Sequence, residues 1–195
     1  MTCIVGLVTK QGVWMGGDSA GVAGYHLSVR ADEKVFLNSG FLFGFTNSFR
    51  MGQVLRYGFS PPKHHQGLDV YEYMVTEFID AVRNRFRNTG YMAKDNEREE
   101  GGCFMVAYMG RLFTIYGDFQ VGEECRAYSS VGCGEDIAVG ALFAIHKMTG
   151  IEPAKAIRIA LEAAEAGSAG VKRPFKVLFL ANAPAPNQKK KRSRA

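Results

Sequence analysis

The sequence predicts an α+β sandwich in which helices cover antiparallel sheets. Short apolar runs joined by turn residues occur at the start, in the middle and near the end of the chain, as expected for strands. Between them lie one region with helical spacing of apolar residues, at 70–87, and two further helical regions within 135–165. Because strands and helices come in separate runs, the helices should form layers of their own over the sheets.

The first quarter of the chain is predicted to be antiparallel sheet. Residues 2–9 are rich in β-branched residues, and turn residues lead from them to a second apolar run at 13–17. A second hairpin joins 34–37 to 41–45 through Asn38-Ser39-Gly40, residues that tolerate the positive φ angles of a tight turn. Alternating phenylalanines pack sheets, so we expect a core that contains Phe36, Phe41, Phe43, Phe45 and Phe49.

In the middle of the chain the spacing of apolar residues changes. In 70–87 apolar residues recur every three or four positions with charged residues between them, which predicts an amphipathic helix. The polar stretch 91–102 is predicted to be a loop. The runs 103–108 and 111–116 then form a hairpin around Met109-Gly110, and one more strand begins at 128–131.

The last part of the predicted domain contains two helices and a strand. Residues 135–149 are apolar on nearly all sides, which suits a helix between a sheet and another surface, and Gly150 is placed to end it. A second helix begins at Pro153 and runs to about residue 165, and 176–180 is the final strand. We therefore expect one domain over 1–181, followed by a disordered basic tail over 182–195.

Length and apolar patterning limit the class of protein. A chain of 195 residues suits one domain with a large core. There is no apolar run of about 18 residues and no signal-peptide pattern, so we expect a cytoplasmic protein without a membrane partner. The four cysteines are widely spaced, with no CxxC pair, so neither a metal site nor a cofactor is expected.

Charge argues against a nucleic-acid partner. The formal net charge is +5, but five basic residues lie between 189 and 194, and the other basic residues equal the 19 acidic ones in number. The basic character therefore belongs to the tail and not to the body of the protein. A polyanion-binding function would have to reside in that tail.

The second residue is a candidate nucleophile. Thr2 directly follows the initiator methionine, and removal of Met1 would give it a free α-amine beside its own hydroxyl. An α-amine has a pKa of about 7.7–8.0, so it can accept the hydroxyl proton at neutral pH, whereas a lysine at about 10.4 cannot readily do so. One residue would then supply both nucleophile and base.

Two charged residues complement Thr2. Asp18 ends the second predicted strand and Lys34 opens the third. If these three strands are adjacent, the Lys34 ammonium favours the ionised hydroxyl of Thr2, and Asp18 keeps Lys34 charged and oriented.

These residues resemble the N-terminal-nucleophile hydrolases of proteasome β-subunit type, with the bacterial HslV peptidase closest in style. The resemblance rests on Met-Thr-Cys-Ile-Val-Gly at 1–6, Gly-Asp-Ser-Ala at 17–20, Lys34-Val35, Gly-Phe-Thr-Asn at 44–47 and Val-Gly-Cys-Gly at 131–134. It extends from Thr2 to the strand near Leu180. It implies a four-layer αββα sandwich, stacked homo-oligomeric rings, a possible ATP-dependent unfoldase partner, and hydrolysis of peptides or unfolded proteins through an acyl-enzyme on Thr2.

The resemblance also implies supporting residues. The backbone N–H near Asn47 would stabilise the oxyanion, and Gly21 and Val22 would line the groove for an extended substrate. Cys133 stands where the family usually has serine, and it is a weaker hydrogen-bonding partner for the amine. The family's aspartate and serine after the last long helix have no clear counterpart; Glu165 or Ser168 could substitute. Asn47 replaces a common glycine and is expected to narrow the pocket.

The sequence leaves other functions open. The departure at Cys133 and the missing aspartate and serine also suit a ring-forming structural subunit without catalytic activity. A third possibility is a polyanion binder that acts through the tail at 189–194.

Overall fold

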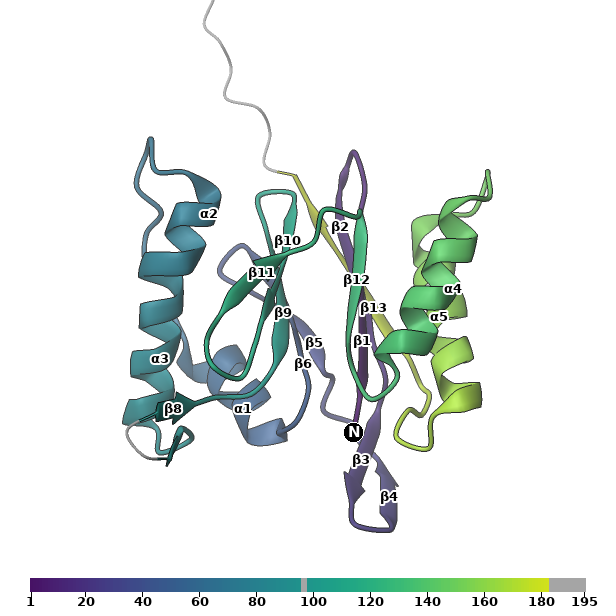
Figure 1. Cartoon of the computed structure of the whole chain (residues 1–195), viewed down its shortest axis with the longest axis horizontal. Helices are drawn as coiled ribbons and strands as arrows, with labels where there is room; N and C mark the ends of the chain where they lie inside the picture. Colours follow the sequence, from purple (N-terminus) through teal and green to yellow (C-terminus); the bar gives the residue numbers. More distant parts are fainter. Residues whose placement is uncertain (96–97, 183–195) are drawn as a thin grey trace, which may run out of the picture.

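Two sheets face each other between two layers of helices (Figure 1). The computed structural model describes residues 1–95 and 98–182. The predicted tail, and with it the proposed polyanion site, lies outside the described residues beyond Asn182. Asn182 itself is hydrogen-bonded: its backbone N–H donates to the Gln11 carbonyl at 2.9 Å and its side-chain amide to the Lys10 carbonyl at 3.0 Å.

The first sheet has four antiparallel strands and combines the two ends of the chain. Its order is β12-β1-β2-β13. The strands span Cys3–Val8 (β1), Gly12–Gly17 (β2), Tyr128–Gly132 (β12) and Lys176–Ala181 (β13). In β1, Cys3 lies opposite Gly132 and Ile4 lies opposite Gly17. This register brings the start of the chain beside the ends of β2 and β12.

The second sheet has five antiparallel strands in the order β11-β10-β9-β6-β5. They span Val35–Asn38 (β5), Phe41–Phe45 (β6), Phe104–Tyr108 (β9), Arg111–Ile115 (β10) and Val121–Glu123 (β11). The predicted turn between β5 and β6 is present, with positive φ at Ser39 and Gly40. The hairpin of β9 and β10 is also present.

Three apolar clusters hold the layers together. The cluster between the sheets contains residues such as Ile4, Met15 and Met105. A larger one between the five-stranded sheet and its helices contains most of the buried aromatic residues, and it confirms the predicted phenylalanine core: Phe36, Phe41, Phe43 and Phe45 are buried, and Phe49 packs against them. The third lies between the four-stranded sheet and its helices. These clusters confirm the predicted α+β arrangement of sheets covered by helices.

Helices cover the outer faces of both sheets (Figure 1). On the five-stranded sheet lie α2 (Val70–Tyr73), a π-type segment η2 (Met74–Phe78) and α3 (Ile79–Asn88), which follow one another without a break and match the predicted helix. Asp69 caps them by accepting hydrogen bonds from the N–H groups of Tyr71 and Glu72. On the four-stranded sheet lie α4 (Glu135–His146) and α5 (Pro153–Gly167).

The prediction for the α4 region was wrong at its end. The helix ends at His146 and does not reach residue 149. The N–H groups of Lys147 and Met148 bond to carbonyls three residues back, so the last turn tightens and stops. Gly150 has positive φ, but it lies in the connection beyond this turn.

Several short elements were not predicted. A hairpin of β3 (Ala20–Ala23) and β4 (His26–Val29) follows β2, and α1 (Phe49–Gln53) with a π-type segment η1 (Val54–Gly58) follows β6. The predicted loop at 91–102 includes β7 (Ala93–Asp95) and β8 (Arg98–Glu100). Among the described residues, no helix is both long and apolar enough to cross a membrane.

Candidate active site

Thr2 lies immediately before β1, between the ends of two neighbouring strands. Its exposed fraction is 4%. Its carbonyl accepts the Gly134 N–H at 3.4 Å, and its own N–H points to the Cys133 sulfur, 3.3 Å away. Thr2 is therefore buried at one end of the sandwich.

Asp18 lies just after β2, and backbone groups from three segments fix its carboxylate. Oδ1 accepts the Cys3 N–H at 3.0 Å, and Oδ2 accepts the N–H groups of Ala20 at 2.8 Å and Lys172 at 3.2 Å. The residue is 2% exposed. A buried carboxylate with this many donors is oriented in one direction and can hold a cation beside it.

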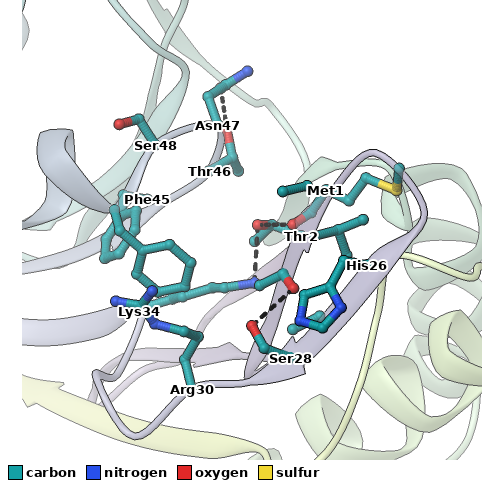
Figure 2. A pocket seen from close by; sticks show the side chains of 15 residues that line it. Met1, Thr2, His26, Ser28, Arg30, Lys34, Phe45, Thr46, Asn47 and Ser48 are labelled. Atoms are coloured by element: carbon teal, nitrogen blue, oxygen red, sulfur yellow. Dashed lines mark hydrogen bonds between the residues drawn. The ribbon is translucent and has the colours of Figure 1, made fainter.

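Lys34 completes a buried triangle with Thr2 and Asp18 (Figure 2 shows the contact with Thr2). Its Nζ donates to Thr2 Oγ1 at 3.0 Å and to Asp18 Oδ1 at 2.8 Å, and the residue is 1% exposed. Burial lowers the pKa of Lys34 below its ordinary value, while the charge and hydrogen bond of Asp18 oppose that change. The structure therefore brings together the three side chains that the sequence singled out.

The arrangement of strands that achieves this differs from the prediction. Three adjacent strands were expected, but only β1 and β2 are neighbours. Lys34 precedes β5, which belongs to the opposite sheet, and the unpredicted β3–β4 hairpin separates it in sequence from Asp18. The triangle thus spans the two sheets of the sandwich.

Cys133 contacts the backbone of Thr2. Its sulfur accepts the Thr2 N–H and also a hydrogen bond from Ser168 Oγ at 3.4 Å. Glu165 and Ser168 were the two candidates to substitute for the family's aspartate and serine, and of these Ser168 contacts the thiol of Cys133. Glu165 instead binds the backbone N–H and the guanidinium of Arg173 at 3.0 and 2.7 Å and fixes the segment before β13.

A cavity of about 210 Å³ opens beside Thr2 and Lys34. Gly21 and Val22 of β3 line it, as does Asn47. A Cβ atom on Gly21 would lie 2.8 Å from Ser28 Oγ and 2.9 Å from Arg30 Cγ, so only glycine allows β3 to approach β4 this closely. The predicted substrate-binding residues Gly21 and Val22 thus line the same cavity as Thr2 and Lys34, whereas Asp18 does not line it.

Asn47 has the left-handed conformation, with φ of 59°. Its side-chain Oδ1 accepts the Cys103 N–H at 3.1 Å, which holds the side chain at the upper rim in Figure 2, away from Thr2. Within residues 1–95 and 98–182, no protein acceptor engages the backbone N–H of Asn47.

Sequence reasoning missed one wall of this cavity. His26, Ser28 and Arg30 line it from β4 and the residue that follows. Arg30 is fixed by Asp32, with both hydrogen bonds at 2.7 Å, and its guanidinium lies 4.2 Å from the centre of the Phe49 ring. The alternation of His26 to Val29 after Gly24, whose φ is positive, was the available signal for this hairpin.

Met1 lies at the rim of the cavity, and 57% of it is exposed. Its carbonyl accepts a hydrogen bond from the Thr2 hydroxyl (Figure 2). While Met1 is present, the nitrogen of Thr2 is an amide and cannot act as a base. The exposed position leaves Met1 accessible to an aminopeptidase.

No cluster of three or more histidine, cysteine, aspartate or glutamate residues suited to a metal ion occurs in the part of the chain that the structure describes. The Lys34 ammonium, held by the Asp18 carboxylate, lies beside the Thr2 hydroxyl and can polarise it.

The fold is similar to that of solved proteasome-like subunits, as the sequence resemblance indicated. BPH from Thiobacillus denitrificans, solved in complex with epoxomicin, superposes with a TM-score of 0.76 at 16% identity over 94% of this chain and 100% of that chain. HslV from Trypanosoma brucei gives 0.67 at 18% identity over 93% and 100%.

The Anbu protein, an ancestral β-subunit, from Yersinia bercovieri superposes with a TM-score of 0.61 at 16% identity over 92% of this chain and 82% of that chain. No family model matches the sequence, and no curated protein matches it either. The likeness is therefore one of fold.

Proposed function

We propose that the protein is a threonine peptidase of a self-compartmentalising, cytoplasmic homo-oligomer with the αββα fold of its structural relatives. Its substrates are peptides or unfolded protein segments, and Thr2 is the nucleophile once Met1 is removed. The observation that carries the proposal is the buried triangle, in which Lys34 Nζ lies 3.0 Å from Thr2 Oγ1 and 2.8 Å from Asp18 Oδ1.

The reaction proceeds in two steps in this proposal. The free amine of Thr2 takes the proton from Oγ1, which attacks the carbonyl carbon of the scissile peptide bond. The C–N bond breaks, the leaving amine receives the proton from the Thr2 ammonium, and an ester on Oγ1 remains. Water, deprotonated by the same amine, then hydrolyses the ester and regenerates the enzyme.

Lys34 and Asn47 stabilise charge along this path. The Lys34 ammonium lies beside Oγ1, so it favours the developing alkoxide, and Asp18 holds that ammonium in place. Asn47 lines the cavity, and in the part of the chain that the structure describes no protein acceptor engages its backbone N–H, so we assign the oxyanion to this N–H. A donor of this kind contributes roughly 3–4 kcal/mol to the transition state.

The first experiment tests Thr2 directly. Hydrolysis of short fluorogenic peptides is measured for the wild type and Thr2→Ala, after intact-mass spectrometry has shown that Met1 is removed. We expect Thr2→Ala to lose at least about 100-fold in kcat/KM, since nucleophile and base chemistry contribute at least that much, and Thr2→Ser to retain measurable activity.

Thr149→Ala is the matched control, since it removes the same side chain from an exposed turn between α4 and α5. Its activity should equal that of the wild type. Epoxomicin, with which the Thiobacillus relative forms a complex, should block the wild type. Equal rates for the wild type and Thr2→Ala would rule out Thr2 as nucleophile.

A second candidate function is a catalytically silent structural subunit, favoured by the thiol of Cys133 at the position next to the Thr2 nitrogen. A thiol is a weaker hydrogen-bonding partner than a hydroxyl. Retention of Met1 in the intact mass, together with no hydrolysis by either the wild type or Cys133→Ser, would favour this function. If Cys133→Ser hydrolyses peptides and the wild type does not, the thiol of Cys133 is the cause of the missing activity.

A further inference from the structure

Cys133 differs from the other cysteines in combining exposure with a fixed partner. Cys3 is buried and Cys103 is partly buried, and burial raises the pKa of their thiols to about 12 and about 11, so both keep their protons at neutral pH. Cys125 is exposed, but among the described residues no group is hydrogen-bonded to its sulfur. Cys133 is exposed, and its sulfur contacts Thr2.

The backbone on both sides of Cys133 lies against Thr2. Gly132 has φ of 106°, and a Cβ atom there would lie 2.2 Å from the Thr2 carbonyl oxygen, so only glycine lets the two segments approach this closely. On the other side of Cys133, the Gly134 N–H donates to the same carbonyl at 3.4 Å. The backbone therefore fixes where the sulfur lies relative to Thr2.

The sulfur of Cys133 faces the backbone nitrogen of Thr2. The N–H of Thr2 donates to this sulfur at 3.3 Å, and the Ser168 hydroxyl donates to it at 3.4 Å. The thiol itself donates to the Thr2 carbonyl, also at 3.4 Å. Because a direct hydrogen bond leaves no room for another atom between the nitrogen and the sulfur, a small movement of either segment brings the two atoms to bonding distance.

We propose that Cys133 is a site of reversible oxidation, at which its sulfur forms a covalent bond with the Thr2 nitrogen. Hydrogen peroxide or an organic peroxide is the oxidant. The sulfur attacks a peroxide oxygen, the O–O bond breaks, and Cys133 becomes a sulfenic acid as water or an alcohol leaves. The sulfur thereby loses the two electrons that reduce the peroxide.

The second step joins the two residues. The Thr2 nitrogen attacks the sulfur of the sulfenic acid, the S–N bond forms as the S–O bond breaks, and the hydroxyl leaves as water with the proton of the nitrogen. Since a sulfenic acid condenses in this way with a backbone nitrogen, the step is open to the Thr2 amide before Met1 is removed and to the amine afterwards. A thiol reverses the bond: one molecule takes the sulfur as a mixed disulfide while its proton returns to the nitrogen, and a second molecule releases the Cys133 thiol and leaves as a disulfide with the first.

The bond also removes the base, and this consequence rests on the proposed function. A nitrogen that is bonded to the Cys133 sulfur is no longer a free amine, so it cannot take the proton from Thr2 Oγ1. Peptide hydrolysis therefore stops under oxidation and resumes under reduction. The bond itself forms whether or not the protein hydrolyses peptides.

Peptide mapping by mass spectrometry tests the bond. The full chain is treated with hydrogen peroxide, digested with trypsin in the absence of a reductant, and compared with untreated protein. The expected product links the peptide over 127–147, which contains Cys133, to the N-terminal peptide that ends at Lys10. The mass of the linked pair is lower than the sum of the two peptides by two hydrogens, fragmentation places the link on the Thr2 nitrogen, and dithiothreitol separates the pair.

Three variants accompany the wild type. Cys133→Ser lacks the sulfur and should give no linked pair. Cys125→Ser is the matched control, since it removes another exposed thiol, and it should give the same pair as the wild type. Cys3→Ala removes the other sulfur of the N-terminal peptide, so a pair that persists in this variant is not a disulfide between Cys3 and Cys133. Circular dichroism melts check that all three variants fold.

Hydrolysis of fluorogenic peptides before and after peroxide tests the consequence. The wild type and Cys125→Ser should lose at least about 10-fold in rate, since a general base contributes more than that, and regain it with dithiothreitol, whereas Cys133→Ser should keep its own starting rate. The inference is overturned by a peroxide-treated wild type without the linked pair, by a pair that is lost in Cys3→Ala, or by equal losses of rate in the wild type and Cys133→Ser. A linked pair in a protein that hydrolyses no peptide supports the bond and counts only against the proposed function.

Discussion

The ion pair of Lys34 and Asp18 is energetically demanding, because both side chains are buried almost completely. Removing two charges from water costs several kcal/mol each, and only good geometry offsets that cost. Here Asp18 Oδ1 also accepts the Cys3 N–H and Oδ2 accepts two further backbone N–H groups. The fold thus satisfies both oxygens of the carboxylate with hydrogen bonds.

Replacing only one member of this pair should be costly. We expect Lys34→Met to lose about 3–5 kcal/mol of unfolding free energy, because it leaves the Asp18 carboxylate buried without its cation. The double variant with Asp18→Asn should lose less. Urea denaturation measures both.

The control for Lys34→Met is Lys176→Met, which breaks a largely exposed pair with Glu33 at 2.7 Å and should cost at most about 1 kcal/mol. Equal losses at Lys34 and Lys176 would contradict the assignment of a buried, energetically coupled pair.

Cys3 predicts a loss of stability at alkaline pH. Burial raises the pKa of its thiol from 9.0 to about 12. Between these values the folded chain keeps a proton that the unfolded chain has released, so the free energy of unfolding falls as pH rises, by up to about 1.4 kcal/mol per pH unit.

The measurement compares urea denaturation of the wild type and Cys3→Ala at about pH 8, where the thiol is mostly protonated in both states, and at about pH 10.5, where the two states differ. The variant should lose less stability over this range than the wild type. Groups common to both proteins, such as Cys103, cancel in the comparison. The same pH dependence in both would show that the Cys3 thiol does not remain protonated.

At the scale of elements, the sequence predicted most of the strands and helices that carry the large clusters, but not α1 and η1, which add Met51, Val54 and Leu55 to one of them. The phenylalanine strands β5 and β6 and the helices after Asp69 and at Pro153 have strong periodicity and clear turn or cap residues. The β3–β4 hairpin was missed because it is short, largely exposed and interrupted by glycines. Its residues therefore do not alternate clearly between an apolar and a polar face.

Gly44 of β6 shows how closely the two sheets approach. A Cβ there would lie 2.5 Å from Ile4 Cγ2 and 2.7 Å from Met15 Sδ, both in the four-stranded sheet. We expect Gly44→Ala to cost about 1–3 kcal/mol of unfolding free energy, because one sheet must shift, and to reduce peptide hydrolysis, because Ile4 lies two residues after Thr2.

Gly117→Ala serves as the comparison for Gly44→Ala, since the nearest atom to its Cβ would be 3.7 Å away. Thermal melts and peptide assays on the two variants test the expectation. A Gly44→Ala protein as stable as Gly117→Ala would show that the sheets are not in close contact there.

At the scale of the whole molecule, the sequence predicted which three side chains come together, but not which strands and sheets carry them. Neighbouring strands along the chain are often neighbours in a sheet, which favoured one sheet for all three residues. The actual partners of β1 and β2 are β12 and β13, from the other end of the chain. No local sequence pattern specifies which strands pair when they lie so far apart along the chain. Lys34, directly before β5, therefore lies on the opposite sheet from Thr2 and Asp18.

That division of the triangle between two sheets has a consequence for the life of a newly made chain. Neither sheet by itself can present a polarised hydroxyl, since the ammonium arrives only with the other half of the sandwich. Under the proposed function, a chain that is still folding therefore has no means of cutting its neighbours. Cleavage then becomes possible only once the two sheets have come together.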